Sequence, residues 1–149
     1  MAIDDELPVM VDRTPHHVGI AVANLDAVRA FYEQTFDFEL VEEFTVTGEA
    51  FEKGIGADDA TGQFARLSMG DVLLELVEYD PHGENRAAPA VTDRGAVHLA
   101  FEYDDVAAFY STLDAAVETI SEPVTTESGT TILFLRDPEG NLIELVSPP

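Results

Sequence analysis

One arrangement of segments occurs twice in this chain, and this internal repeat limits the fold more than any other feature. Each half begins with an alternating segment led by a histidine and containing small residues, His17-Val-Gly-Ile-Ala and His98-Leu-Ala-Phe-Glu. Near its end, each half has one glutamate between apolar residues, in Leu74-Glu-Leu-Val and Ile143-Glu-Leu-Val. A repeat of this length predicts two copies of one supersecondary unit that bury a common core.

The first copy, 14–79, has the pattern of a strand, a helix and three further strands. Asn24 is a suitable N-cap for a helix over 25–35, where apolar residues recur at helical spacing. The glycine-containing stretch 48–62 is expected to be a flexible loop that can act as a lid. Strands are predicted from alternation and turn residues over 17–22, 38–46, 63–69 and 72–79.

The second copy, 95–148, repeats this order after a linker over 80–94 that is rich in proline, glycine and charge. A helix is predicted after Asp104 or Asp105, and strands are predicted over 98–103, 117–124, 130–136 and 142–146. The segment 1–13 has no periodicity and is expected to be a loose arm. The pattern therefore predicts an α+β fold made of two βαβββ modules.

The charge balance excludes several classes of partner. The chain has 30 acidic and 7 basic residues, a formal net charge of -23. Such a chain lacks the basic surface that nucleic-acid phosphates require, so no nucleic-acid partner is expected. Because 46% of the 149 residues are hydrophobic, the composition suits a packed core rather than a disordered acidic protein. Acidic residues spread over a globular pattern indicate a surface adapted to high salt, a halophilic character.

The sequence contains no cysteine, which excludes disulfides, thiolate metal sites and a cysteine nucleophile. It has neither a long apolar run nor a signal-peptide pattern. A soluble cytoplasmic protein with no membrane partner is therefore expected.

Four side chains recur at equivalent places of the repeat: His17, Glu75, His98 and Glu144. Two modules related by a pseudo-twofold axis could bring them together at one point. Two imidazoles and two carboxylates suit a divalent ion such as Mn, Fe, Co, Ni or Zn. Such an ion can polarise a carbonyl group while a carboxylate removes a proton from the neighbouring carbon. Taken singly, each histidine or glutamate could instead be a core or surface residue, but the repetition favours a shared metal site.

The chain resembles the vicinal oxygen chelate superfamily from Thr14 to Pro148. This superfamily includes glyoxalase I, methylmalonyl-CoA epimerase, extradiol dioxygenases and bleomycin-resistance proteins. The resemblance implies paired βαβββ modules in a cup-shaped mixed sheet, metal ligands on the first and fourth strands of each module, and a homodimer. The motifs that carry it are His17-Val-Gly-Ile-Ala-Val, Leu74-Glu-Leu-Val, Val97-His-Leu-Ala-Phe and Asp137-Pro-Glu-Gly-Asn-Leu-Ile-Glu-Leu.

The full set of four ligands is most similar to that of bacterial glyoxalase I, and close to that of methylmalonyl-CoA epimerase. The resemblance implies a metal-dependent lyase or isomerase that uses Ni, Co, Mn or Zn. It would move a proton next to a chelated carbonyl group of a small oxygenated substrate, with Glu144 as the proton shuttle and Glu75 as the other candidate. The chain has no tryptophan, and Ala21-Val22 stand where a basic residue is expected, which argues against glutathione as cosubstrate.

Two other functions stay open. An extradiol-type dioxygenase would hold Fe(II) with His17, His98 and Glu144, and Glu75 counts against it because it adds a fourth ligand. A metal-free protein that sequesters a drug would have no use for the histidine and glutamate set.

Two arginines and two further histidines are also considered as site residues. Arg66 and Arg136 lie in predicted strands, where each could form a structural ion pair or grip an anionic substrate group. His16 and His82 are expected to be solvated, with His16 facing away from His17.

Overall fold

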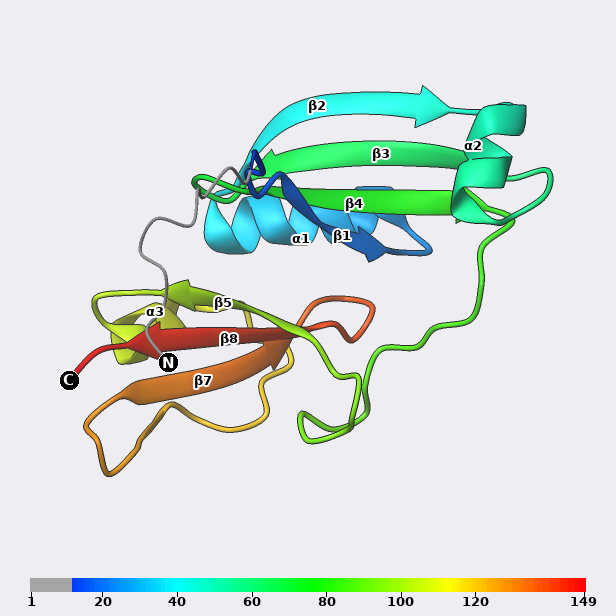
Figure 1. The fold of residues 1–149 in the computed structure, drawn as a ribbon. Helices are drawn as coiled ribbons and strands as arrows, with labels where there is room; N and C mark the ends of the chain where they lie inside the picture. The colour runs from blue at the N-terminus through cyan, green and yellow to red at the C-terminus, as the bar shows by residue number, and fades with distance from the viewer. Residues whose placement is uncertain (1–11) are drawn as a thin grey trace, which may run out of the picture.

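The computed structural model describes residues 12–149, which form two four-stranded sheets and three helices (Figure 1). We call β1 to β4 with α1 and α2 the N-terminal module, and β5 to β8 with α3 the C-terminal module. The elements are β1 (His17–Ala21), α1 (Leu25–Phe36), β2 (Glu39–Val46), α2 (Glu49–Ile55), β3 (Thr61–Ser68), β4 (Leu73–Asp80), β5 (His98–Glu102), α3 (Val106–Thr112), β6 (Val124–Thr125), β7 (Thr131–Arg136) and β8 (Leu142–Ser147).

The two sheets have the same topology. Their strand orders are β1-β4-β3-β2 and β5-β8-β7-β6, and the only parallel pairs among them are β1 with β4 and β5 with β8. The register is also equivalent, since Glu75 lies opposite Gly19 and Glu144 lies opposite Ala100. The predicted α+β class with repeated modules is therefore confirmed, and the small residues of the first strands lie beside the glutamates.

Both modules share one hydrophobic core on the helix side of the sheets. In Figure 1, α1 lies along the N-terminal sheet and α3 along the C-terminal sheet. Aromatic rings join the two modules, because Phe36 stacks on Phe109 at 5.9 Å and Phe38 meets Phe101 at 5.2 Å. The opposite face of β1 and β5, which carries His17 and His98, is exposed.

A short helix replaces part of the predicted lid loop over 48–62. The helix α2 has glutamates in its first turn, Lys53 in its last turn, and a left-handed end at Gly56 with φ of 70°. These charges suit the helix dipole, and glycine adopts the positive φ without strain. None of the helical residues is buried. The helix packs against the sheet chiefly through Phe51, and one such residue gives no periodic pattern that the sequence could reveal.

The strand predicted over 117–124 is mostly absent. Only β6 belongs to a ladder, and a single bridge between Thr119 and Leu135 precedes it. Pro123 has no N–H group to donate to a ladder, which explains why regular pairing does not extend through this segment.

The predicted arm over 1–13 lies outside the described residues except for its last two, which are exposed. Within residues 12–149, no helix is long and apolar enough to cross a membrane.

A turn of the C-terminal module, residues 137–141, holds the first helix of the N-terminal module. Asp137, which is buried, accepts hydrogen bonds from the backbone of Glu139 and Asn141 and from the hydroxyl of Tyr32 at 3.0 Å. The carboxylate of Glu139 accepts hydrogen bonds from the N–H groups of Ala23 and Asn24 at the start of α1. The turn 137–141 therefore caps and anchors α1, which links the two modules through polar contacts as well as apolar ones.

We expect Tyr32→Phe to lower the free energy of unfolding by about 2 kcal/mol, because the buried Asp137 carboxylate loses a hydrogen-bond donor. Burial raises the pKa of Tyr32 well above its ordinary value, and the negative charge of Asp137 adds to this effect. The stability that the neutral phenol contributes is complete below pH about 10 and is lost as the pH rises further. The variant should therefore lose less stability than the native protein between pH about 9 and about 11.

Urea denaturation across this pH range measures both effects. Tyr110→Phe, which removes the hydroxyl of a partly buried tyrosine on α3, is the matched control. Equal alkaline sensitivity in Tyr32→Phe and the native protein would contradict the assigned role of the hydroxyl.

The acidic surface generates a prediction about salt. Glu39 and Glu127 are among the exposed carboxylates, and the chain carries a net charge of -23. Salt shortens the Debye length from about 10 Å at 0.1 M to about 3 Å at 1 M, which weakens repulsion between such groups. We expect the melting temperature to rise with KCl, and to rise less in the double variant Glu39→Gln, Glu127→Gln. A melting temperature independent of KCl would be the contrary result.

Candidate functional site

In the N-terminal module, His17 and Glu75 form a pair across two neighbouring parallel strands. His17 is the first residue of β1, and Glu75 lies in the middle of β4. The distance from Nε2 of His17 to Oε1 of Glu75 is 3.5 Å, and the Glu75 side chain is 9% exposed. Gly19 lies opposite Glu75 in the register, and a Cβ atom there would meet only the ring of His17, at 3.8 Å. The alternation of β1 and its parallel register with β4 thus place the two side chains beside each other.

The C-terminal module repeats the pair with His98 and Glu144. The distance from Nε2 of His98 to Oε1 of Glu144 is 3.2 Å, and the Glu144 side chain is 20% exposed. Both histidine side chains are 37% exposed. Each module therefore places one imidazole nitrogen beside one carboxylate oxygen, and the histidine of each pair is partly exposed.

A single chain does not bring the two pairs together. Among residues 12–149, no group of three or more histidine, aspartate or glutamate side chains is placed to hold a metal ion. The strands that carry the histidines, β1 and β5, belong to separate sheets (Figure 1). The repeat in the sequence predicts equivalent positions within each module, but the docking of the modules through their helices decides where the pairs lie.

Glu75 has a second partner in Arg66. The Nε of Arg66 donates to Oε2 of Glu75 at 2.7 Å, and Nη1 donates to Glu42 at 3.1 Å. The guanidinium group also lies over the ring of Phe44 at 4.7 Å. The hydrogen bond to Glu75 raises the pKa of Arg66. Of the two roles considered for Arg66, the structure supports the ion pair.

His16 does not face away from His17, which corrects the sequence-based expectation. The two Nδ1 atoms are 2.7 Å apart, and the rings meet edge to face at 5.0 Å. His16 precedes the first residue of β1, and although its carbonyl oxygen accepts the N–H of Leu73, its ring turns toward His17. A neutral His16 can accept the Nδ1–H of His17, and in that tautomer the lone pair on Nε2 of His17 is free to bind a metal ion.

An aromatic cluster covers the sheet face beyond Glu75. Phe44 stacks on Phe64 at 4.8 Å, and Phe51 of α2 contacts Phe64 and Tyr79. A Cβ atom at Gly62 would lie 2.7 Å from the Phe64 ring, so only glycine permits this approach. The helix α2 thus closes one end of the face that carries the first pair.

Arg136 has a structural role. It donates to the carbonyl groups of Ala88, Pro89 and Gly140, which fastens the linker to the turn before β8. A guanidinium group engaged with three carbonyl groups is not free to grip a substrate.

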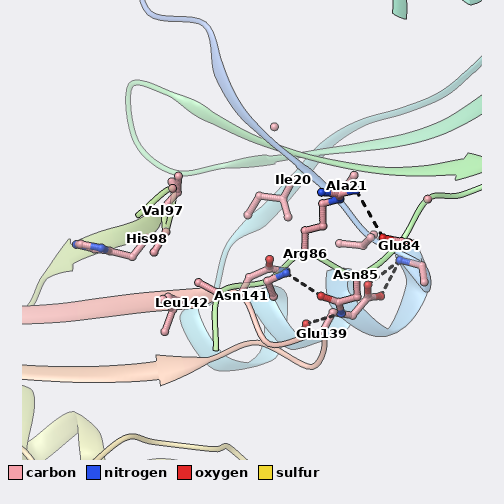
Figure 2. Close-up of a pocket in the computed structure, with 18 of the residues that line it drawn as sticks. Ile20, Ala21, Glu84, Asn85, Arg86, Val97, His98, Glu139, Asn141 and Leu142 are labelled. Atoms are coloured by element: carbon pink, nitrogen blue, oxygen red, sulfur yellow. Dashed lines mark hydrogen bonds and ion pairs between the residues drawn. The ribbon is translucent and has the colours of Figure 1, made fainter. Parts of the chain in front are cut away.

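A cavity of about 590 Å³ lies between β1, linker residues 82–88, the start of β5 and the turn that ends at Leu142. Figure 2 shows Glu84, Asn85 and Arg86 of the linker around it, while the ring of His98 points away from the other labelled side chains. Of the four predicted ligands, only His98 contributes to the lining. The cavity therefore adjoins the second pair at His98 and does not include the first pair.

The comparisons with known proteins decide the family. The model of the Glyoxalase/Bleomycin resistance protein/Dioxygenase superfamily matches residues 14–145. The chain belongs to this superfamily. It includes enzymes and binding proteins that are not enzymes, its members bind small molecules and often form dimers, and divalent metals are typical of it.

Similar solved structures share this fold. A glyoxalase family protein from Bacillus cereus has 24% identity and a TM-score of 0.79, with 93% of this chain and 97% of that one covered. A glyoxalase family protein from Enterococcus faecalis has 25% identity and a TM-score of 0.61, with 92% and 99% covered. An antibiotic binding protein from Streptomyces has 19% identity and a TM-score of 0.64, with 94% and 99% covered. No curated protein matches the chain.

Proposed function

We propose that this protein is a metal-dependent lyase or isomerase of the glyoxalase type. It would move a proton next to the chelated carbonyl group of a small oxygenated substrate. The observation that carries this proposal is the imidazole–carboxylate pair at the same place of each module, with distances of 3.5 Å and 3.2 Å between the donor atoms. Surface ion pairs alone would not require a histidine and a glutamate at equivalent register positions of both sheets.

The chemistry of the donor set fits a divalent first-row ion. Each pair offers one imidazole nitrogen and one carboxylate oxygen, which are ligands suited to Ni, Co, Mn, Zn or Fe. Such an ion, when bound by His17, Glu75, His98 and Glu144, would polarise the substrate carbonyl group.

Two copies of the chain would complete the site. Each module of one chain offers two metal-ligating atoms. A site with four ligands therefore requires the first pair of one copy to meet the second pair of another copy. The exposure of both histidines supports this arrangement, because the faces that carry them are uncovered by the helices of the same chain. The proposal therefore includes a homodimer with two equivalent sites.

Glu144 is the proposed proton carrier. Its carboxylate would take a proton from the carbon next to the carbonyl group, while the electron pair of the broken C–H bond stays in the substrate. The same carboxylate would return the proton to a neighbouring atom of the substrate. Its greater exposure, 20% against 9% for Glu75, gives it the freedom that such a transfer needs.

Metal binding tests the first part of the proposal. We expect the native protein to bind Ni²⁺ or Co²⁺, as measured by calorimetry and elemental analysis. His17→Ala and His98→Ala should each weaken binding by more than the roughly 10- to 100-fold loss that outer partners of metal ligands cause. His82→Ala, which changes an exposed linker histidine, is the control. Native protein that binds no divalent ion would refute the proposal.

Mixing the two histidine variants tests whether two chains share a site. If each site takes one pair from each chain, a mixed dimer of His17→Ala and His98→Ala has one site with both histidines intact. Metal binding should then reappear when the two variants are unfolded and refolded together. A site formed within one chain would stay defective in every mixture.

Proton exchange tests the reaction. We expect the metal-loaded protein to incorporate solvent deuterium next to the carbonyl group of at least one member of a panel of small carbonyl and thioester compounds, followed by NMR. Glu144→Gln should abolish exchange, a loss on the order of 100-fold or more for a general base. Oxygen consumption with Fe²⁺ and a catechol, without exchange, would favour the dioxygenase instead.

A second candidate function is a metal-free binding protein. The cavity near β1 and β5 favours it, because three of the four candidate ligands do not line it and its volume suits a small molecule. The antibiotic binding protein of similar fold adds a precedent for such a use of the fold. Tight binding of a drug-like molecule that persists in His17→Ala and in the presence of a chelator would select this function.

A further inference from the structure

The two modules place different residues beside their equivalent glutamates. In the N-terminal sheet, the residue opposite Glu75 on the neighbouring antiparallel strand is Arg66. In the C-terminal sheet, the residue opposite Glu144 is Phe134. A cation in one copy thus corresponds to an aromatic ring in the other, although the histidines and glutamates match.

Arg66 is held from three sides. Its Nε donates to Oε2 of Glu75 at 2.7 Å, its Nη1 donates to Glu42 at 3.1 Å, and its guanidinium group lies over Phe44 at 4.7 Å. A planar guanidinium group with these contacts has little freedom to turn. It fixes Oε2 of Glu75 and leaves Oε1 directed at Nε2 of His17, 3.5 Å away.

Glu144 lacks such a restraint. In the part of the chain that the structure describes, its one ion-pair partner is His98, at 3.2 Å. Phe134 meets the His98 ring edge to face at 5.1 Å and has no polar atom to offer the carboxylate. The Glu144 side chain is also more exposed than that of Glu75. A change of rotamer at Glu144 therefore breaks only its contact with His98, whereas at Glu75 it would also break the hydrogen bond to Arg66.

We infer that Arg66 is a positioning residue that fixes Glu75 as a stationary metal donor, which leaves Glu144 as the carboxylate free to carry the proton. This inference rests on the proposed function, since it assigns separate roles to the two carboxylates of the same site. Arg66 acts only through Glu75 and would touch neither the substrate nor the ion.

Co²⁺ titration of the full-length protein tests the inference without a substrate. We expect Arg66→Met to weaken Co²⁺ binding by roughly 10- to 100-fold, the effect of removing a residue that orients a metal ligand. Arg29→Met is the matched control, because Arg29 also pairs with two carboxylates, Glu33 and Glu43, on the same module. The control should bind Co²⁺ as the native protein does.

A double variant separates positioning from a general loss of structure. If Arg66 acts through Glu75, Arg66→Met combined with Glu75→Gln should bind Co²⁺ no more weakly than Glu75→Gln alone. In a Glu144→Gln background, Arg66→Met should still produce its full effect. Equal effects of Arg66→Met in both backgrounds would overturn the inference.

The outcomes of these titrations also distinguish a failure of this inference from a failure of the proposed function. A native protein that fails to bind Co²⁺ refutes the proposed function and the inference with it. A native protein that binds Co²⁺ while Arg66→Met matches Arg29→Met refutes the inference alone. If Arg66→Met shows no cooperative thermal transition, Arg66→Lys replaces it. Lysine keeps the positive charge but lacks the planar guanidinium group, so the Arg66→Lys protein should still bind Co²⁺ more weakly than the control. Native-like binding by this variant would count against the inference.

Discussion

Glu75 lies in the middle of β4 with strands on both sides, and its carboxylate needs compensation because the side chain is almost entirely shielded from water. An isolated charge in such a place costs several kcal/mol. The neighbouring strands meet this requirement from both directions. Arg66 on β3 supplies the charged hydrogen bond, and His17 on β1 lies 3.5 Å from the other carboxylate oxygen. One carboxylate therefore constrains residue choice on three adjacent strands, and the imidazole of His17 completes its surroundings.

The strands that carry the candidate site could be predicted because their physics is local. Alternation in β1 and β5 separates a core face from a histidine face, and a glutamate within an apolar run marks β4 and β8. Repetition then turns two weak signals into one strong signal, since a chance histidine or glutamate has no reason to recur at the same register. Each histidine indeed lies next to the glutamate of its own module.

Features that depend on contacts between distant segments could not be predicted in this way. The helix α2 has no buried face, and the contact of His16 with His17 depends on the path of the chain before β1. The register that sets Arg66 beside Glu75 and Phe134 beside Glu144 appears only when the antiparallel strands are aligned. The docking of the modules was also beyond the periodic pattern, because aromatic rings such as Phe36 contact the other module through the helix side.

The turn 137–141 shows how docking and chemistry are connected. Its dense run of turn formers looks like a functional-site motif. The carboxylate of Asp137 nevertheless accepts a hydrogen bond from Tyr32, and the carboxylate of Glu139 accepts hydrogen bonds from the N–H groups at the start of α1. These bonds, together with the shared core, hold the two modules in the relation that keeps the pairs apart. A four-ligand site within one chain would require this packing to open, at the cost of the buried Asp137. The proposed association of a second copy with the exposed histidine faces would require no such rearrangement.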